Sequence, residues 1–215
     1  MKSSARRPEE TRIAVFAKAP VAGEVKTRLV PILGAEGAAR LHAQLVRRAL
    51  ATAIESNVGP VELWCAPDAS HPFFASCAEE FAVPVFAQAG RDLGERMRNA
   101  FDTAFANASA LVIVGSDCPA LDRDRLASAA AALRSHDAVL VPAEDGGYVL
   151  IALTQPVPGL FDGIAWGSAE VLAATRSRLA AAGVRRVEQP PLWDVDRAED
   201  YSRLVETGWL DRVQA

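Results

Sequence analysis

The feature that most constrains the fold is the stretch of residues 111–119, where an apolar run ends in a glycine and a single carboxylate. Residues 111–114 are apolar and mostly β-branched, which predicts a strand buried on both faces, as found inside parallel sheets. Gly115 ends the run, and Pro119 prevents the strand from continuing. Ligands of open α/β sheets bind just beyond the carboxyl ends of the strands, so Asp117 lies where a site is expected.

Two roles are open to Asp117. A lone aspartate at a strand end suits a divalent cation that in turn holds phosphate oxygens. The alternative is a cap on a turn or on the next helix, but Asp122 is better placed to cap that helix. The functional interpretation is therefore favoured.

Strand-like and helix-like segments alternate along the chain. This alternation predicts βα units and an α/β fold, a three-layer α/β/α sandwich with a mostly parallel central sheet. Residues 1–215 are expected to form one domain, with a polar and flexible lead at residues 1–11. The strand at 83–86 contains a proline, which places it near a sheet edge. The expected strands are 13–17, 61–65, 83–86, 111–114, 137–142, 148–151 and 184–187, and the expected helices are 35–56, 73–81, 93–107, 123–135, 168–182 and 196–206.

Composition narrows the class of partner. The chain has 215 residues and a formal net charge of −4, and this mild acidity argues against nucleic acid as the main partner. Residues 1–12 lack the apolar segment of a signal peptide, and no apolar stretch reaches the ~18 residues that a membrane span needs. The three cysteines are odd in number and lack metal-site spacing, so a reducing cytoplasm is expected.

The loop after the first predicted strand is basic. Lys18, Lys26 and Arg28 lie there beside Gly23, and such side chains can wrap a diphosphate. The glycine spacing of a P-loop is missing, and so is the GxGxxG pattern of dinucleotide-binding folds. The alternative is a solvated loop, but basic residues directly after a strand of an acidic protein favour phosphate contact.

Carboxylates recur near the C-terminus. Asp194 and Asp196 stand at i and i+2 in an extended segment, so either could join Asp117 on one cation. The competing interpretation is a capping box, with Asp196 as the N-cap of the last helix and Glu199 at N3.

Two further segments combine glycine with a side chain that could meet an acceptor. Asp145, Gly146 and Gly147 suit a hairpin turn, or a bare backbone that a sugar approaches while Asp145 binds its hydroxyl groups or acts as a base. Trp166 either packs in a loop or stacks on a substrate ring, and Ser168 after it is expected to cap a helix.

The remaining polar candidates are weaker. Asp92 fits the N-cap of the helix at 93–107. The histidines, His42, His71 and His136, accompany no nucleophile, so no catalytic triad is indicated and each is expected at the surface.

These motifs together resemble one branch of the GT-A-fold nucleotide-diphospho-sugar transferases. That branch is the family known as arsenosugar-biosynthesis-type glycosyltransferases, related to the molybdenum-cofactor and phospholactate nucleotidyltransferases. The resemblance runs over residues 13–204, in the family's order of motifs. It is carried by Gly23-x-x-Lys26-Thr27-Arg28-Leu29, Gln88-x-Gly90-x-Asp92-Leu93-Gly94-Glu95-Arg96-Met97, Gly115-Ser116-Asp117-x-Pro119, Asp145-Gly146-Gly147-Tyr148 and Asp194-Val195-Asp196.

The resemblance implies a transferase that uses a nucleotide donor and Mg²⁺ or Mn²⁺. The expected reaction is glycosyl transfer from a nucleotide-diphospho-sugar to a small acceptor, with Asp117 and Asp196 on the metal and Asp117 and Asp145 as the catalytic carboxylates. Lys18, Gly23, Lys26, Arg28 and Asp92 would then contact the nucleotide, and Gly146, Gly147 and Trp166 the acceptor.

Two other functions stay open. One is nucleotidyl transfer, in which a phosphorylated acceptor attacks a nucleoside triphosphate and releases pyrophosphate. The other is a nucleotide-binding protein without catalysis. Gly23 stands alone where pyrophosphorylases carry several glycines, so fewer backbone amides can approach a triphosphate, which favours a diphosphate donor.

Overall fold

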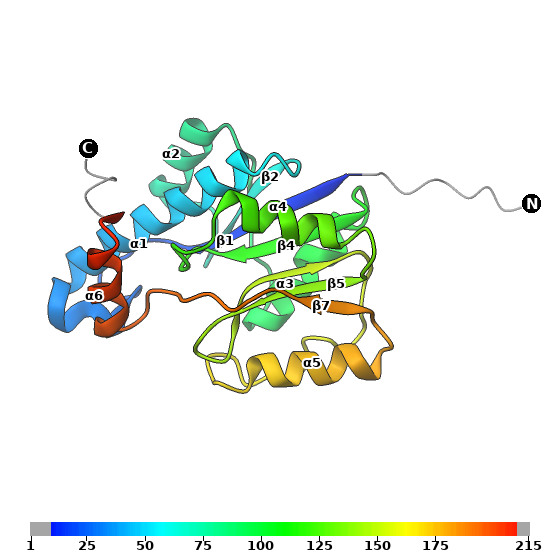
Figure 1. Ribbon diagram of the computed structural model, residues 1–215. Coiled ribbons are helices and arrows are strands. Elements are labelled where there is room, and N and C mark those ends of the chain that lie inside the picture. Colours follow the sequence, from blue (N-terminus) through cyan, green and yellow to red (C-terminus); the bar gives the residue numbers. More distant parts are fainter. Residues whose placement is uncertain (1–9, 210–215) are drawn as a thin grey trace, which may run out of the picture.

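The computed structural model describes residues 10–209, and within them a mixed sheet forms the middle of three layers (Figure 1). The strands are β1 (Thr11–Lys18), β2 (Val61–Ala66), β3 (Val85–Ala87), β4 (Ala110–Gly115), β5 (Ala138–Pro142), β6 (Tyr148–Leu153) and β7 (Arg186–Glu188). Their order is β3-β2-β1-β4-β6-β5-β7, and only β6 runs antiparallel to its neighbours. The predicted α/β fold with a mostly parallel sheet is confirmed, as is the edge position of the proline-preceded strand β3.

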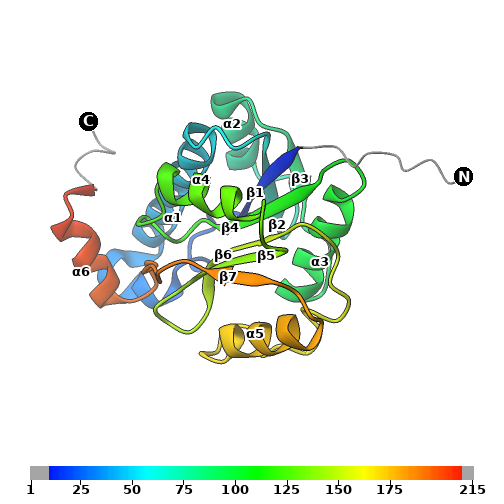
Figure 2. The ribbon, with the colours of Figure 1, turned by 45° about the vertical axis from the view of Figure 1, so that its right-hand side comes forward.

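Helices cover both faces of the sheet, as Figures 1 and 2 show. On one face α1, α2 and α4 pack in one apolar cluster, and on the other α3 and α5 pack in a second. The helices are the 3₁₀ turn η1 (Thr27–Leu29), α1 (Val30–Glu55), α2 (Pro72–Phe81), α3 (Leu93–Ala104), α4 (Arg123–Ala132), α5 (Val171–Ala181) and α6 (Ala198–Glu206).

The two central strands explain why both faces are covered. Successive side chains of a strand point to opposite faces, so the apolar run of β1 sends Ile13 and Val15 into one cluster and Ala14 and Phe16 into the other. The run at 111–114 divides in the same way, and every one of its side chains is buried. The predicted doubly buried strand is therefore β4.

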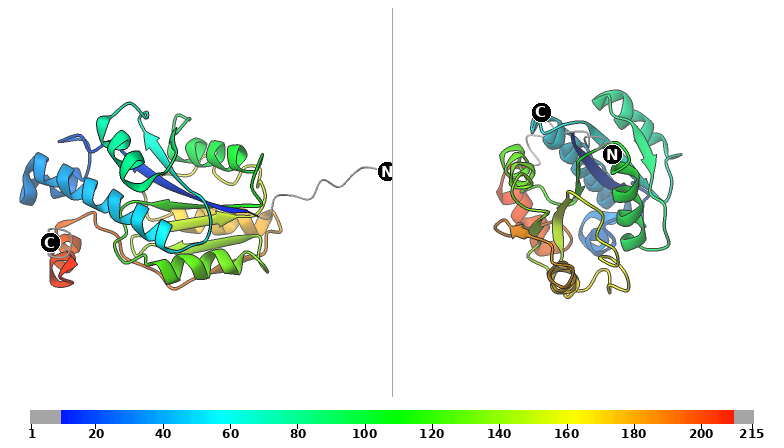
Figure 3. Two further views of the ribbon diagram at one scale, coloured as in Figure 1. Left: turned by 90° about the horizontal axis from the view of Figure 1, so that it is seen from above. Right: turned by 90° about the vertical axis from the view of Figure 1, so that its right-hand side faces the viewer.

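A third apolar cluster holds the C-terminal part of the described chain against its beginning. Leu204 of α6 packs with Leu29 and with Leu41 and Leu45 of α1, so that α6 lies beside the first part of α1 (Figure 3). The helix α1 starts before the predicted residue 35, and its path is interrupted at Gly34, which has φ 68°. This positive φ suits glycine because it has no Cβ.

Some predicted boundaries are wrong. Ser168 does not cap α5, which begins only at Val171. The Ser168 hydroxyl instead donates to the Ala165 carbonyl and accepts from the Glu170 N–H, at 2.7 and 3.3 Å. A turn after the left-handed Gly167 (φ 82°) delays the helix by three residues. α3 ends at Ala104, three residues earlier than expected. Of the predicted lead, residues 1–9 lie outside the described residues, and β1 already begins at residue 11.

The carboxyl ends of the five strands that run with β1 meet at one edge of the sheet. The basic loop follows β1 there, Asp117 follows β4, and the β5–β6 turn carries Asp145. All three cysteines are buried and unbonded. Among residues 10–209, no helix has both the length and the apolar character that a membrane crossing requires.

Candidate functional site

Two adjoining clefts lie at this edge of the sheet. The first cleft, about 670 Å³, lies between the end of β1, the loop before η1 and the start of α3. The second cleft, about 370 Å³, lies between the β5–β6 turn and the segment that enters α6. Arg28, Gly167 and Asp196 line both clefts and mark their junction. Of the predicted site residues, Lys18, Lys26, Asp92, Asp117 and Trp166 also line the first cleft, and Asp145 lines the second.

Asp117 lies two residues beyond the end of β4, and its Oδ1 gathers basic groups. Lys26 Nζ is 2.9 Å from this oxygen, and His42 Nδ1 is 3.7 Å from it. Burial disfavours the charged carboxylate, but the charge of Lys26 and the nearby His42 ring outweigh it and hold the pKa of Asp117 well below its usual range. The side chain is 45% exposed, so an ionised carboxylate faces the first cleft.

Lys26 is buried although it carries a charge, with a side chain only 4% exposed. Besides Asp117, its ammonium contacts the Val195 carbonyl, to which it donates at 2.6 Å. Its backbone is left-handed (φ 49°), which is uncommon for a residue other than glycine. These two partners leave one N–H donor of the ammonium for the phosphate contact that the sequence predicts for Lys26.

His42 is not at the surface, contrary to the sequence prediction. It is 4% exposed, its Nε2 lies 3.0 Å from the Lys18 carbonyl, and its buried Nδ1 has no hydrogen-bond partner. The carbonyl can only accept, so Nε2 carries a proton and donates. His42 shares the buried face of α1 with Ala38, Leu45 and Val46. This i, i+3, i+4 spacing was the sequence signal for its burial.

At the junction of the clefts, Arg28 forms an ion pair with Asp196. Asp196 is not the N-cap of the last helix, because Arg197 holds that position and α6 begins at Ala198. The capping carboxylate is that of Asp200, which accepts from the backbone N–H groups of Asp196 and Arg197 at 3.0 and 2.7 Å. The Asp196 carboxylate thus takes no part in the cap, and its partner is Arg28.

Carboxylates outnumber basic side chains in the lining of the second cleft. Asp194 has a pKa raised to about 6, first by burial and then by the charges of Asp145 and Asp117. Glu144 is neutralised by Arg203 at 2.9 Å, and Asp145 accepts the Gly147 N–H at 2.9 Å, closing its turn. The carboxylates that line this cleft are Glu144, Asp145, Asp194, Asp196 and Asp200, against the cations Arg28 and Arg197.

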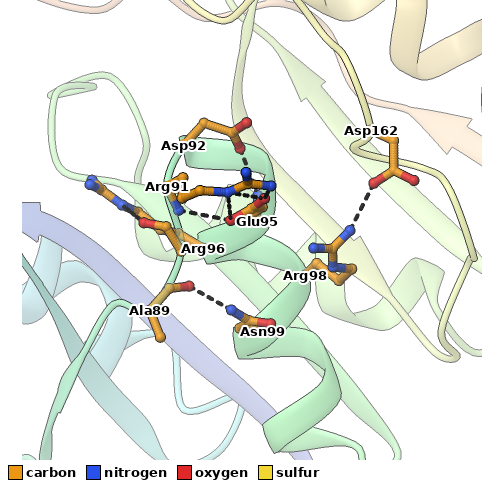
Figure 4. Close-up of polar contacts among 9 residues, drawn as sticks. Ala89, Arg91, Asp92, Glu95, Arg96, Arg98, Asn99 and Asp162 are labelled. Atoms are coloured by element: carbon orange, nitrogen blue, oxygen red, sulfur yellow. Dashed lines mark hydrogen bonds and ion pairs between the residues drawn. The ribbon is translucent and has the colours of Figure 1, made fainter.

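The start of α3 forms one wall of the first cleft, and its polar contacts are local (Figure 4). Asp92 caps the helix by accepting the Glu95 N–H at 2.8 Å, which confirms its predicted N-cap role. Glu95 pairs with Arg91, while Arg96 extends from the other side of the helix. Further along, Arg98 reaches across to Asp162 at 2.8 Å and ties α3 to the loop at 159–167.

Trp166 belongs to that loop and lines the first cleft. Its indole packs near Phe161 and against Gly94 of α3, where an added Cβ would lie 2.7 Å from the Phe161 carbonyl and 2.9 Å from the indole. Of the two roles open to Trp166, packing is present, and its buried indole N–H has no hydrogen-bond partner among residues 10–209. Trp166 lines the first cleft and not the second, and its contact with an acceptor stays a prediction.

Comparisons with known proteins identify the family. The profile described as "Uncharacterized protein conserved in bacteria (DUF2064)" matches residues 49–168, more than half of the chain. The chain belongs to this family. A crystal structure from Desulfovibrio desulfuricans G20, described as a "putative nucleotide-diphospho-sugar transferase", is 33% identical with a TM-score of 0.84, over 93% of this chain and 87% of that one. No curated protein matches.

More distant structures share the fold. CMP:2-keto-3-deoxy-manno-octonic acid synthetase in complex with CTP has 10% identity and a TM-score of 0.60, over 94% of this chain and all (100%) of its own. Rv0371C of Mycobacterium tuberculosis H37Rv in complex with manganese has 17% identity and a TM-score of 0.56, over 93% and 99%. At these identities the likeness shows the fold alone.

In this member of the family, backbone conformation accounts for Gly23 and Gly146, and a close side-chain contact bears on Gly147. Gly23 has φ 83° with open space around it, so its turn needs glycine while nothing approaches closely. At Gly146 (φ 94°) an added Cβ would lie 2.4 Å from the Ala169 carbonyl, and at Gly147 it would lie 3.2 Å from the Asp145 carboxylate. Contacts of these glycines with a substrate remain predictions.

Proposed function

We propose that this protein is a metal-dependent transferase that moves a glycosyl group from a nucleotide-diphospho-sugar to a hydroxyl group of a small acceptor. The observation that carries the proposal is the pair of clefts, which place basic side chains around Asp117 on one side and carboxylates on the other. The donor diphosphate would lie in the first cleft, near Lys18, Lys26 and Arg28. The relative from Desulfovibrio, whose description names the same class of donor, supports this.

The residues at the junction fit a divalent cation. Magnesium and manganese prefer oxygen ligands and are often held by one or two carboxylates together with substrate phosphates. The described residues contain no group of three or more His, Cys, Asp or Glu side chains placed to hold a metal ion. Asp117 and Asp196 both line the first cleft and would hold the cation. When bound, the metal would stabilise the negative charge of the departing diphosphate.

The second cleft favours a neutral acceptor. A phosphorylated acceptor, which nucleotidyl transfer needs, would meet the carboxylates of this cleft and be repelled. A hydroxyl group can instead donate to Asp145 or Asp194. The raised pKa of Asp194, about 6, suits a base that takes this proton near neutral pH. Asp194 thus joins Asp145 as the proposed acceptor of the hydroxyl proton.

A thermal-shift panel tests this function. UDP- and GDP-sugars, CTP, GTP, ATP and UTP would each be added with and without Mn²⁺. A ligand at about a hundred times its dissociation constant stabilises the folded state by about 2.7 kcal/mol. A metal-dependent shift with one sugar nucleotide, lost in Asp117→Asn, supports glycosyl transfer. A larger shift with a nucleoside triphosphate favours nucleotidyl transfer, and no shift with any ligand contradicts a nucleotide donor. Nucleotide binding without turnover of any acceptor would indicate the non-catalytic alternative.

A further inference from the structure

The basic side chains of residues 26–28 are held by the two carboxylates that would bind the metal. Lys26 contacts Asp117 at 2.9 Å, and Arg28 pairs with Asp196. Each proposed metal ligand is thus already neutralised by a neighbouring cation. The same cations are the ones expected to contact the diphosphate, so a metal ion would compete for the carboxylates of these pairs and a diphosphate for their cations.

We propose that Lys26 is an internal counter-ion of Asp117 that gives way when metal and diphosphate enter together, and that it keeps a metal ion from binding well alone. Arg28 would leave Asp196 in the same way. This inference rests on the proposed function, because it takes Asp117 as a metal ligand.

Electrostatics makes the two cations competitors. A divalent ion on Asp117 would lie close to an ammonium that is 2.9 Å from the same carboxylate and shielded from water, so the two would repel strongly. Lys26 lines the first cleft, and a diphosphate there offers its ammonium a new partner. Phosphate in the cleft therefore lowers the cost of moving the lysine away from Asp117.

The charge balance favours joint entry. Two carboxylates and two basic side chains sum to zero in this structure. A divalent ion and the two negative charges of a sugar-nucleotide diphosphate also sum to zero, so their joint entry keeps the site neutral. Metal alone would leave two surplus positive charges in a partly buried site, and such unpaired charge is costly there.

The alternative is that Lys26 stays in contact with Asp117 at all times and orients its carboxylate. Its contact with the Val195 carbonyl, at 2.6 Å, would serve such a role equally well. The two views predict opposite effects of removing the ammonium. A lysine that orients Asp117 would be needed for metal binding, whereas a lysine that competes with the metal ion would hinder it.

The deciding experiment is a titration of Mn²⁺ without nucleotide, with free Mn²⁺ measured by electron paramagnetic resonance. The variants are Lys26→Met and the matched control Lys18→Met, which removes the same charge from the same cleft. Lys18 has no carboxylate partner among residues 10–209. Lys26→Met should bind Mn²⁺ at least about ten-fold more tightly than wild type, and Lys18→Met within about three-fold of it, because only Lys26 contacts a proposed ligand.

Three results would overturn the inference: Lys26→Met binding Mn²⁺ no more tightly than wild type, binding it less tightly, or gaining no more than Lys18→Met. Adding Asp117→Asn to Lys26→Met separates the two proposals. Binding that survives this change would refute the metal assignment itself, while lost binding keeps that assignment whatever Lys26 does. If Lys26→Met fails to fold, as judged by circular dichroism, the titration is repeated with Lys26→Gln, which removes the same charge but keeps a polar side chain.

Discussion

The two clefts differ in how their charges are balanced. In the first cleft Asp117 meets a buried lysine and a buried histidine, and the pKa of its carboxyl is held low. In the second cleft burial and the charges of Asp145 and Asp117 outweigh the nearby charge of Lys26, and the pKa of Asp194 rises to about 6. One site keeps an anion ready for a cation, and the other keeps a carboxyl that can exchange a proton near neutral pH. This division matches a donor side and an acceptor side.

The largest effect is expected from removing the Asp117 carboxylate, around which the charges of the first cleft are balanced. Asp117→Asn keeps the shape of the side chain but removes the proposed metal ligand, so turnover should fall at least about a hundred-fold, in the range of losing one group that stabilises a leaving anion. Steady-state rates with the donor found by thermal shift measure this. Asp124→Asn is the control, since Asp124 is 91% exposed on α4. Equal rates for Asp117→Asn and wild type would remove Asp117 from the reaction.

The crowded carboxylates of the second cleft should make the free energy of unfolding depend on pH. The folded-state pKa of Asp194 lies above its usual 3.8. The favourable contribution of this carboxyl to the free energy of unfolding is therefore complete below pH 3.8 and is lost as pH rises through about 6. Asp194→Asn should therefore be more stable than wild type at pH 8, by at most about 3 kcal/mol, and gain little at pH 4. Urea unfolding at both pH values measures this. A gain that is equal at pH 4 and pH 8 would contradict the crowded carboxylate.

The two clefts also differ in how well the sequence predicted them. Asp117, Lys18 and Arg28 sit directly at strand ends or in the following loop, and such positions are set by local pattern. His42 was missed because its role depends on α1 crossing over Asp117, a contact across 75 positions (117 − 42) of sequence. For Asp196 the sequence left two roles open, metal ligand and helix N-cap, because Glu199 and Asp200 can each supply the second carboxylate of a capping box and the sequence does not decide a shift of one residue.

A substitution at Gly94 tests how α3, which forms one wall of the first cleft, packs against the loop at 159–167. An alanine there would place Cβ 2.7 Å from the Phe161 carbonyl, so the loop at 159–167 must move, and overpacking of this kind costs about 1–3 kcal/mol. Gly37→Ala is the control, because its Cβ would meet only side chains of its own helix, at 3.1 Å or more. Chemical denaturation of both variants measures the difference. A Gly94→Ala variant as stable as wild type would show that the loop adapts without cost.

The smallest effect is expected from the other tie between this loop and α3, the ion pair of Arg98 with Asp162. Both side chains are well exposed, at 42% and 63%, so Arg98→Ala should cost no more than about 1 kcal/mol. The difference from wild type should shrink further in ~1 M salt, where exposed charges are screened. Melting curves at low and high salt check both points. If Arg98→Ala lowers the free energy of unfolding as much as Gly94→Ala does, the ion pair rather than packing fixes the loop at 159–167. The junction of the two clefts would then be stabilised by an exposed surface contact.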